Sequence, residues 1–260
     1  MDPLLIERRD ALAVLTLNRP DKHNALSLDL LRRLHAALDA LGEDAGVRCV
    51  VLRGNDRCFS TGMDLADLAG VSAVAETQRA LSVFRDANAA VERCPKPVVC
   101  AIEKYAMGVG LELAMACDIR LATKDSVLAL PEVTLGQIPG SGGSQRVARI
   151  AGLTRAVDMM MLGRRIPAPE AHAWGLVTRV VEDSAALDKE IDEVVGKLTS
   201  MSPLALKTIK RVLATAYETG IGVGLEVEGH AYEKLRQTED YKEGIAAFSE
   251  KRKPKFKDRL

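Results

Sequence analysis

The stretch that decides the fold runs from residue 98 to residue 122 and reads VVCAIEKYAMGVGLELAMACDIRLA. Its first five residues form a compact apolar run that is typical of a buried strand. A turn containing Gly108 and Gly110 follows, and then come a short helix predicted over about 110–116 and a strand over about 118–122. A strand, a helix and another strand in this order predict a βα unit rather than a β-sandwich.

The same alternation extends toward the N-terminus. Residues 11–17 and 48–52 predict two more short strands. Ser27 is a predicted N-cap, because leucine and alanine recur at helical spacing over residues 30–41 after it. A long helix is predicted over residues 74–93. The N-terminal part of the chain therefore predicts an α/β core.

The pattern changes from about residue 183. Residues 184–200, 203–218 and 224–250 each show helical spacing, and no strand is predicted between them. The boundary between the α/β core and this helical region is expected between residues 178 and 203. The fold class that follows is α/β with a helical C-terminal region.

The composition limits the classes of partner. Lys and Arg total 36 and so do Asp and Glu, which gives a sequence pI of about 6.9. This balance predicts no overall attraction to nucleic acid or to an anionic membrane. Aromatic residues make up 3% of the chain, too few to stack a series of bases. No run reaches the ~18 apolar residues of a membrane span, so the expected location is the cytoplasm.

The cysteines and histidines predict neither disulfides nor a metal site. The five cysteines include no C-x-x-C pair and lie mostly in apolar runs, which predicts buried thiols in a reducing compartment. The four histidines lie far apart, without the spacing of a ligand pair. We therefore expect no bound metal.

Glycines mark two turns, one at Gly62 and one at Gly108 and Gly110. A glycine turn that leads into a helix directs backbone N–H groups at a ligand, where the helix dipole favours negative charge. Together the two turns can offer a pair of N–H donors to a thioester oxygen that becomes an enolate. The simpler interpretation is that these glycines only allow tight turns and close packing, and spacing alone leaves both interpretations open.

Two glutamates are candidate acid/base groups. Glu112 lies in the first turn of a helix that is otherwise almost entirely apolar, which predicts a poorly solvated carboxyl group. The alternative is a surface carboxylate that complements the helix dipole. Glu132 follows the apolar run 127–130 and Pro131, and its alternative is a simple turn or N-cap carboxylate. Two carboxyl groups near one substrate can share the work, one holding a proton while the other accepts one.

Two further segments carry weaker signals. Residues 136–146 form a glycine-rich loop that leads into a helix, and this loop either supports a site or packs the helix on the sheet. Residues 251–257 (KRKPKFK) form a basic tail, which is either a solvated end or a contact for phosphate.

An ordered set of short motifs spans nearly the whole chain. It comprises NRPDKHNAL at 18–26, FSTGMDL at 59–65, GVGLELA at 108–114 with CD at 117–118, a P-E…G…P-G…G-G…Q-R pattern at 131–146, WGLV at 174–177 and FSEKRK at 248–253. This set resembles the crotonase (enoyl-CoA hydratase/isomerase) superfamily. The ordered matches are highly specific for the superfamily and less specific for the reaction.

The resemblance implies a fold and an assembly. We expect an α/β fold of the crotonase type, a spiral of ββα units with a helical C-terminal region. Residues 1–195 would form the spiral core with the catalytic site, and residues 196–260 would serve oligomerisation and CoA contacts. The expected assembly is a homotrimer or a dimer of trimers, and neither nucleic acid nor a membrane is expected as a partner.

The resemblance also implies roles for individual residues. By position, the backbone N–H groups of Met63 and Val109 would form an oxyanion hole. Glu112 and Glu132 would be the two acid/base glutamates of a hydratase. The implied substrate is an acyl-CoA, so coenzyme A enters as part of the substrate. No permanently bound cofactor and no metal are expected.

The remaining implied site residues are contacts for substrate or CoA: Lys22, Ala25, Ser60, Thr61, Gly62, Asp64, Leu65, Ala66, Gly108, Gly110, Phe248 and Lys251. Phe248 and Lys251 match positions that contact the nucleotide end of CoA, often across a subunit boundary. Three departures from the family pattern affect substrate preference and CoA contacts more than the fold. Val109 replaces the middle glycine of G-G-G, Lys104 stands where glycine is frequent, and Ala66 stands where some hydratases carry a lysine.

The presence of both glutamates favours a hydratase of fatty acid β-oxidation type, which adds water reversibly and syn to a trans-2-enoyl-CoA and gives a 3-hydroxyacyl-CoA. Many isomerases of the superfamily keep only one of these carboxylates. An enoyl-CoA isomerase or another acyl-CoA lyase on the same scaffold is the closest alternative. A non-catalytic CoA- or RNA-binding protein is the alternative of another class. A serine hydrolase is disfavoured because the sequence contains no G-x-S-x-G.

Overall fold

The computed structural model describes residues 1–55, 57–69, 71 and 73–257. Within these residues the main sheet has six strands in the order β1-β2-β3-β4-β6-β9. Within this described sheet, β1 pairs antiparallel with β2, and the other neighbouring strands pair parallel. Parallel neighbours need crossover connections, which agrees with the helices that the sequence predicts between the strands. The strands of this sheet are β1 (Leu4–Arg9), β2 (Leu12–Leu17), β3 (Cys49–Gly54), β4 (Val98–Ile102), β6 (Ile119–Thr123) and β9 (Arg179–Val181).

A smaller sheet carries the turn that begins the third helix. Its described strands have the order β5-β7-β8, with β5 (Tyr105–Met107) parallel to β7 (Val127–Ala129) and β8 (Ile166–Pro167) antiparallel to β7. The chain leaves β5 at Met107 and enters α3 through Gly108.

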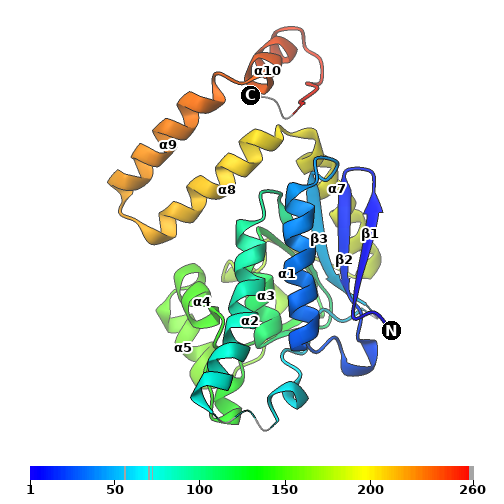
Figure 1. Cartoon of the computed structure of the whole chain (residues 1–260), viewed down its shortest axis with the longest axis vertical. Coiled ribbons are helices and arrows are strands. Elements are labelled where there is room, and N and C mark those ends of the chain that lie inside the picture. Colours follow the sequence, from blue (N-terminus) through cyan, green and yellow to red (C-terminus); the bar gives the residue numbers. More distant parts are fainter. Residues whose placement is uncertain (56, 70, 72, 258–260) are drawn as a thin grey trace.

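Helices cover both faces of the main sheet (Figure 1). The α-helices of the described residues are α1 (Leu28–Glu43), α2 (Val74–Arg93), α3 (Val109–Ala116), α4 (Gly143–Ala151), α5 (Leu153–Met161), α6 (Ala168–Ala173), α7 (Ser184–Ser200), α8 (Pro203–Glu218), α9 (Ile221–Leu235) and α10 (Glu239–Ser249). Short 3-10 helices are η1 (Pro20–Lys22), η2 (Leu65–Leu68) and η3 (Glu132–Leu135).

Successive residues of a core strand point to opposite helical layers. In β3, Val50 and Leu52 join the core formed with α1, α2 and α3. Cys49 and Val51 of the same strand join the core formed with α7. Side chains of a strand alternate between its two faces. A parallel strand between two helical layers therefore needs apolar side chains on both faces.

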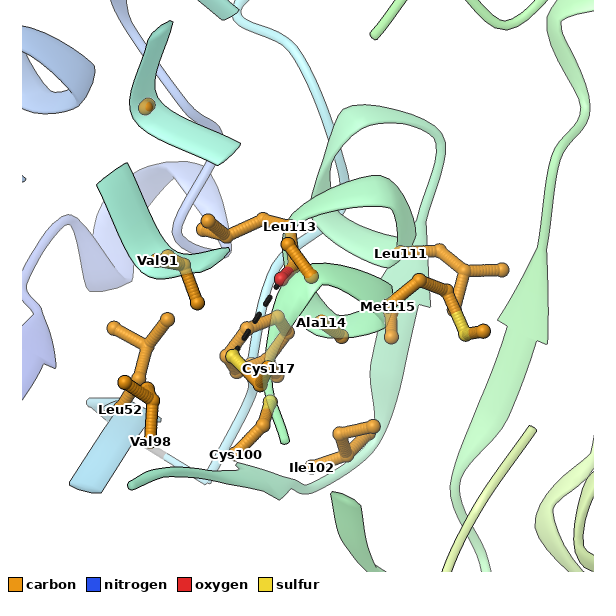
Figure 2. Close-up of a cluster of buried hydrophobic side chains, with 14 of the residues drawn as sticks. Leu52, Val91, Val98, Cys100, Ile102, Leu111, Leu113, Ala114, Met115 and Cys117 are labelled. Atoms are coloured by element: carbon orange, nitrogen blue, oxygen red, sulfur yellow. Dashed lines mark hydrogen bonds between the residues drawn. The ribbon is translucent and has the colours of Figure 1, made fainter. Parts of the chain in front are cut away.

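The helix α3 is enclosed by apolar side chains (Figure 2). Leu111 and Leu113 are fully buried, and so are Cys100 and Ile102 of β4. The Cys117 thiol donates to the carbonyl oxygen of Leu113 at 3.5 Å. All five cysteines are buried, as their apolar settings predict. The prediction that α3 is a buried helix is confirmed.

Most of the predicted elements are confirmed. The helices predicted over 74–93, 184–200 and 203–218 have those bounds. The predicted cap of α1 is also present, because the Ser27 hydroxyl oxygen accepts a hydrogen bond from Leu30 N at 3.2 Å. Strand β1 is absent from the sequence prediction. Only the first of its six residues is buried, so it lacks the apolar alternation of a half-buried strand.

The prediction of one helix over 224–250 is wrong, because α9 and α10 are separate helices. The break occurs at Thr238, whose hydroxyl oxygen caps α10 by accepting a hydrogen bond from Tyr241 N at 3.1 Å. Glu239 and Asp240 then supply acidic side chains to the first turn. A threonine followed by acidic residues is a helix start signal, and here it interrupts a continuous apolar pattern.

The C-terminal helices α8, α9 and α10 extend away from the sheet, and α8 packs along α9 (Figure 1). By contrast, α7 packs on the sheet through the buried residues Leu187, Ile191, Val194 and Val195. The change in packing therefore falls after α7, whereas the predicted limit of 195 falls within that helix. Residues 258–260 of the predicted C-terminal region lie outside the described residues. No helix in the described part of the chain is long and apolar enough to cross a membrane.

Lys104, which replaces a frequent glycine of the superfamily, has a φ of 61°. A Cβ is strained in this left-handed region, and glycine is not. We expect Lys104→Gly to raise the free energy of unfolding by about 0.5–1 kcal/mol, measured by urea denaturation. Lys104→Ala is the control, since it keeps the Cβ and should leave stability unchanged. A glycine variant that is less stable than the alanine variant would contradict this explanation.

Candidate active site

The site begins with a junction between two segments that are distant in sequence. Ser60 pairs with Ala106 in a parallel bridge. Ser60 N donates to Tyr105 O at 2.8 Å, and Met107 N donates to Ser60 O at 3.1 Å. A Cβ on Gly62 would lie 2.8 Å from Met107 O, so the close approach requires glycine there. The junction holds the loop after β3 against the turn that begins α3.

The two predicted oxyanion donors belong to the two joined segments. Among the described hydrogen bonds, neither Met63 N nor Val109 N donates to a protein acceptor. Val109 is the first residue of α3, where N–H groups have no acceptor within the helix. Gly108 adopts the unusual φ of 51° at the N-cap, so the β-branched Val109 needs no strained conformation. Two main-chain donors are therefore available to an oxygen atom of a ligand.

Other predicted contact residues build this junction with their own atoms. The Ser60 hydroxyl donates to Asn24 O at 2.8 Å, and its oxygen accepts a hydrogen bond from Gly62 N at 3.1 Å. A Cβ on Gly110 would lie 2.8 Å from the Cβ of Ser60. Ser60 and Gly110 thus fix the spacing between the loop and α3.

Glu112 is fully buried. Its Oε1 accepts hydrogen bonds from Ser141 N at 2.8 Å and from Gly143 N at 2.7 Å. Its Oε2 accepts a hydrogen bond from the Ser141 hydroxyl at 2.5 Å. These donors replace the water that burial removes. The prediction of a poorly solvated carboxyl is confirmed, and the alternative of a surface carboxylate is wrong.

Glu132 lies at the start of η3, shortly after β7 and directly after Pro131. Both of its carboxyl oxygens are buried, and neither accepts a hydrogen bond from another described residue. Burial raises the pKa of Glu132 to about 7, and the charge of Glu112 adds to the rise. Glu132 does not cap a helix through its side chain, so the simple capping alternative is wrong.

Gly108 connects the two glutamates. Glu112 N donates to Gly108 O at 3.0 Å, and a Cβ on Gly108 would lie 3.1 Å from Oε1 of Glu132. Both glutamates therefore lie beside Gly108, one through its backbone and the other through its carboxyl group. The structure therefore gathers the predicted acid/base pair and the free N–H of Val109 around one turn.

Three further predicted contact residues are Lys22 at the end of η1, Ala25 just after it, and Thr61 in the loop after β3. The Thr61 hydroxyl donates to Lys22 O at 3.5 Å, and Lys22 itself is exposed. The half-buried Ala25 accepts a hydrogen bond from Arg19 Nη1 at 2.6 Å through its carbonyl oxygen. The segment after η1 therefore contacts the loop that carries Thr61.

Asp64 has a structural partner in Arg19. Their ion pair measures 2.6 Å, and it lowers the pKa of the Asp64 carboxyl. The second carboxylate oxygen of Asp64 caps η2 by accepting a hydrogen bond from Ala66 N at 3.2 Å. Leu65 and Ala66 are exposed at the start of η2. Asp64 thus orients the exposed residues that were predicted to contact CoA.

Phe248 and Lys251 are not brought to this site by their own chain. Phe248 is 86% exposed near the end of α10, and Lys251 is exposed just beyond that helix. Figure 1 shows α10 beyond α8 and α9, apart from the region of α3 and α4. Their predicted role therefore requires the site of another subunit.

The described residues contain no cluster of three or more His, Cys, Asp or Glu side chains arranged to hold a metal ion.

Ser141 lies within the glycine-rich loop 136–146, and its sequence pattern indicates no individual role for it. Its hydroxyl and its backbone N–H both bind Glu112. The glycines on each side of Ser141 signal a loop, and nothing in their spacing indicates which carboxyl group the loop meets. The contact joins residues 29 positions apart and becomes visible only in the fold.

Comparisons with known proteins identify the family of this chain. The family model described as "Enoyl-CoA hydratase/isomerase" matches residues 7–259. A probable enoyl-CoA hydratase of Rhizobium meliloti is 39% identical, with 99% of each chain covered. A 2,3-dehydroadipyl-CoA hydratase of Escherichia coli is 37% identical, with 100% of each chain covered.

Solved structures give the same result. An enoyl-CoA hydratase from Bacillus anthracis matches with a TM-score of 0.95 at 36% identity, covering 99% of this chain and 100% of that chain. The chain therefore belongs to the enoyl-CoA hydratase/isomerase family. It is an enzyme, and the predicted crotonase-type α/β fold is confirmed.

Proposed function

We propose that the enzyme adds water reversibly and syn to a trans-2-enoyl-CoA and forms a 3-hydroxyacyl-CoA. The observation that carries this proposal is the contrast between two neighbouring carboxyl groups. Glu112 accepts hydrogen bonds at both oxygens, whereas Glu132 has no donor from another described residue and a pKa raised to about 7. One group is suited to accept a proton and the other to hold one.

In the proposed mechanism, the N–H groups of Met63 and Val109 donate to the thioester oxygen and stabilise the negative charge that develops there. Glu112 accepts a proton from water while the oxygen of that water forms a bond to Cβ of the enoyl group. Glu132 delivers its proton to Cα as the enolate collapses. One O–H bond of water breaks, while one C–O bond and one C–H bond form. The two carboxyl groups return to their starting protonation states when one proton moves from Glu112 to Glu132.

Product analysis tests this reaction against its rivals. With crotonyl-CoA we expect 3-hydroxybutyryl-CoA, and with a 3-enoyl-CoA we expect little migration of the double bond. Isomerisation without a hydrated product would overturn the proposal in favour of an isomerase. Saturable CoA binding without any turnover would indicate a binding protein.

The proposed reaction does not specify the acyl group of the substrate. Relatives are named for different acyl groups, including 2,3-dehydroadipyl-CoA and crotonyl-CoA hydratases at 37% and 35% identity. A panel of short, long, branched and dicarboxylic enoyl-CoAs, compared by kcat/KM, identifies the preferred class.

The raised pKa of Glu132 predicts that kcat/KM decreases on the alkaline side of the pH profile. Glu132 must be protonated to deliver its proton, so kcat/KM for hydration should fall above about pH 7, by up to tenfold per pH unit. The overall reaction neither releases nor consumes a proton. The same decrease should therefore appear in kcat/KM for dehydration of the product. A profile that stays flat to about pH 9 would contradict this role for Glu132.

We also propose a homotrimer or a dimer of trimers. The helices α8 and α9 expose many large apolar side chains: Ile209, Leu213, Tyr217, Ile221, Val223, Leu225, Val227 and Tyr232. An apolar surface of this extent suits contact with another subunit. Such a contact would also allow Phe248 and Lys251 to reach a neighbour's CoA. Light scattering of the purified protein tests the assembly, and a monomer would refute it.

A further inference from the structure

We propose that Ser141 is the positioning residue for Glu112, and that its hydroxyl fixes the plane of the Glu112 carboxylate. The proposal rests on the hydration reaction above, in which Glu112 accepts the proton of water. It assigns a function to a side chain rather than to the glycine-rich backbone around it.

The two oxygens of Glu112 are held by different kinds of donor. Oε1 accepts from two backbone N–H groups, those of Ser141 and Gly143. Among the described hydrogen bonds, the Ser141 hydroxyl is the one donor that reaches Oε2. The torsion between Cγ and the carboxylate of a glutamate is soft. Because the carboxylate is planar, this rotation moves both oxygens together. The N–H donors on Oε1 restrain it at one end of the group, and the Ser141 hydroxyl on Oε2 restrains it at the other.

The peptide that carries Ser141 is itself held from two helices. Ser141 O accepts hydrogen bonds from Asn88 Nδ2 of α2 and from Arg146 Nη1 of α4, each at 2.9 Å. Arg146 is fixed in turn by an ion pair with Glu92 of α2 at 2.7 Å. Arg85 of α2 also donates to Gly140 O at 3.0 Å. Because the loop is anchored to α2 and α4, the Ser141 hydroxyl is held in a fixed position relative to Glu112.

Gly143, the other loop residue that binds Glu112, has no room for a side chain. A Cβ on Gly143 would lie 2.9 Å from Cγ and 3.0 Å from Oε1 of Glu112. Gly143 therefore lets its backbone approach Oε1, while Ser141 contributes a side chain at Oε2. The 4% exposure of Ser141 keeps water from replacing its hydroxyl easily.

The test is the variant Ser141→Ala in the full-length enzyme with crotonyl-CoA. It removes the donor to Oε2 and leaves both N–H donors to Oε1. We expect kcat to fall by about tenfold to hundredfold, the range for losing a hydrogen bond to a charged group. KM should stay within about twofold, because substrate contacts are unchanged. A kcat within about twofold of the unsubstituted enzyme would overturn the proposal.

A matched control separates this role from general loss of a buried hydroxyl. Ser126 is also fully buried, and its hydroxyl donates to Ile102 O at 3.1 Å, away from both glutamates. Ser126→Ala should lower stability and leave kcat nearly unchanged. An equal loss of kcat in the two alanine variants would mean that Ser141 acts only through the fold.

A double-mutant cycle tests whether Ser141 acts through Glu112. In a Glu112→Gln background, Ser141→Ala should cause less than about a twofold further loss of kcat. A loss as large as in the unsubstituted enzyme would show that Ser141 acts independently of Glu112 and would overturn the proposal.

Crystal structures of the free protein give a readout that does not depend on the reaction. We expect one conformer of Glu112 in the unsubstituted protein and a rotated or split carboxylate in Ser141→Ala. An unchanged carboxylate would overturn the positioning role. A rotated carboxylate in a protein that hydrates no enoyl-CoA would instead refute the proposed function alone.

Discussion

Replacing Glu132 with glutamine is expected to lower kcat for hydration by about 10²- to 10⁴-fold while the chain still folds. Glutamine has nearly the same size, but it has no acidic proton to deliver to Cα. The two oxyanion donors and Glu112 remain in place, so substrate binding should persist. The effect should therefore appear in kcat far more than in KM.

The direction in which Glu132→Gln changes the stability of the protein can also be predicted. Burial raises the pKa of Glu132 from 4.5 to about 7, so the native protein binds more protons than the unfolded chain between these values. Stability due to this group is complete below about pH 4.5 and is lost as the pH rises through about 7. A neutral amide does not ionise. At pH 8 the variant should thus be at least as stable as the unsubstituted protein.

Steady-state kinetics with crotonyl-CoA and thermal unfolding at pH 8 measure the two effects together. Glu182→Gln is the control, because Glu182 is exposed and its partner is the exposed Lys124. The control should keep full activity. A Glu132→Gln enzyme with undiminished hydratase activity would refute the scheme of two carboxyl groups.

Glu112→Gln is expected to have an effect of similar size, about 10²- to 10⁴-fold on kcat, because the amide cannot accept the proton of water. Its fold should survive for a specific reason. The amide oxygen can occupy the position of Oε1 and accept from Ser141 N and Gly143 N. The amide NH₂ can then donate to the Ser141 hydroxyl oxygen, which is able to accept.

Glu112→Ala is a poorer test of chemistry, since it would leave buried N–H groups of the loop without acceptors. We expect that variant to be less stable than Glu112→Gln, as measured by thermal unfolding. Full hydration activity in Glu112→Gln would show that another group accepts the proton. Loss of folding in Glu112→Gln would show that the hydrogen-bond exchange at Ser141 does not occur.

Local patterns in the sequence predict most of the fold. Apolar runs such as Val98–Ile102 mark the buried strands, and Ser27 with its helical spacing marks the start of α1. The break between α9 and α10 is not predicted because apolar residues recur on both sides of Thr238, and this periodicity outweighs the helix start signal of Thr238 with its acidic neighbours. The strand β1 was missed because its pairing with β2, rather than its own burial, makes it a strand.

The site is less predictable than the fold, because its parts come from distant segments. The sequence shows that Glu112 lies in an apolar helix, but burial alone does not identify Ser141 as its partner. It shows Glu132 after a strand, but not that Gly108 lies against its carboxyl group. The bridge between Ser60 and Ala106 brings the segments of Met63 and Val109 together, and these segments lie far apart in the sequence. The roles of these residues come from the resemblance and remain predictions.

The junction between the loop at Ser60 and the turn at Gly108 is built from peptide groups, with glycine required at close approach. Amide donors at 63 and 109 exist whatever side chains those positions carry, proline excepted. The side chains of the half-buried Met63 and Val109 can therefore change during evolution without removing these donors. If the two N–H groups activate the thioester as proposed, side-chain divergence at these positions leaves that activation intact.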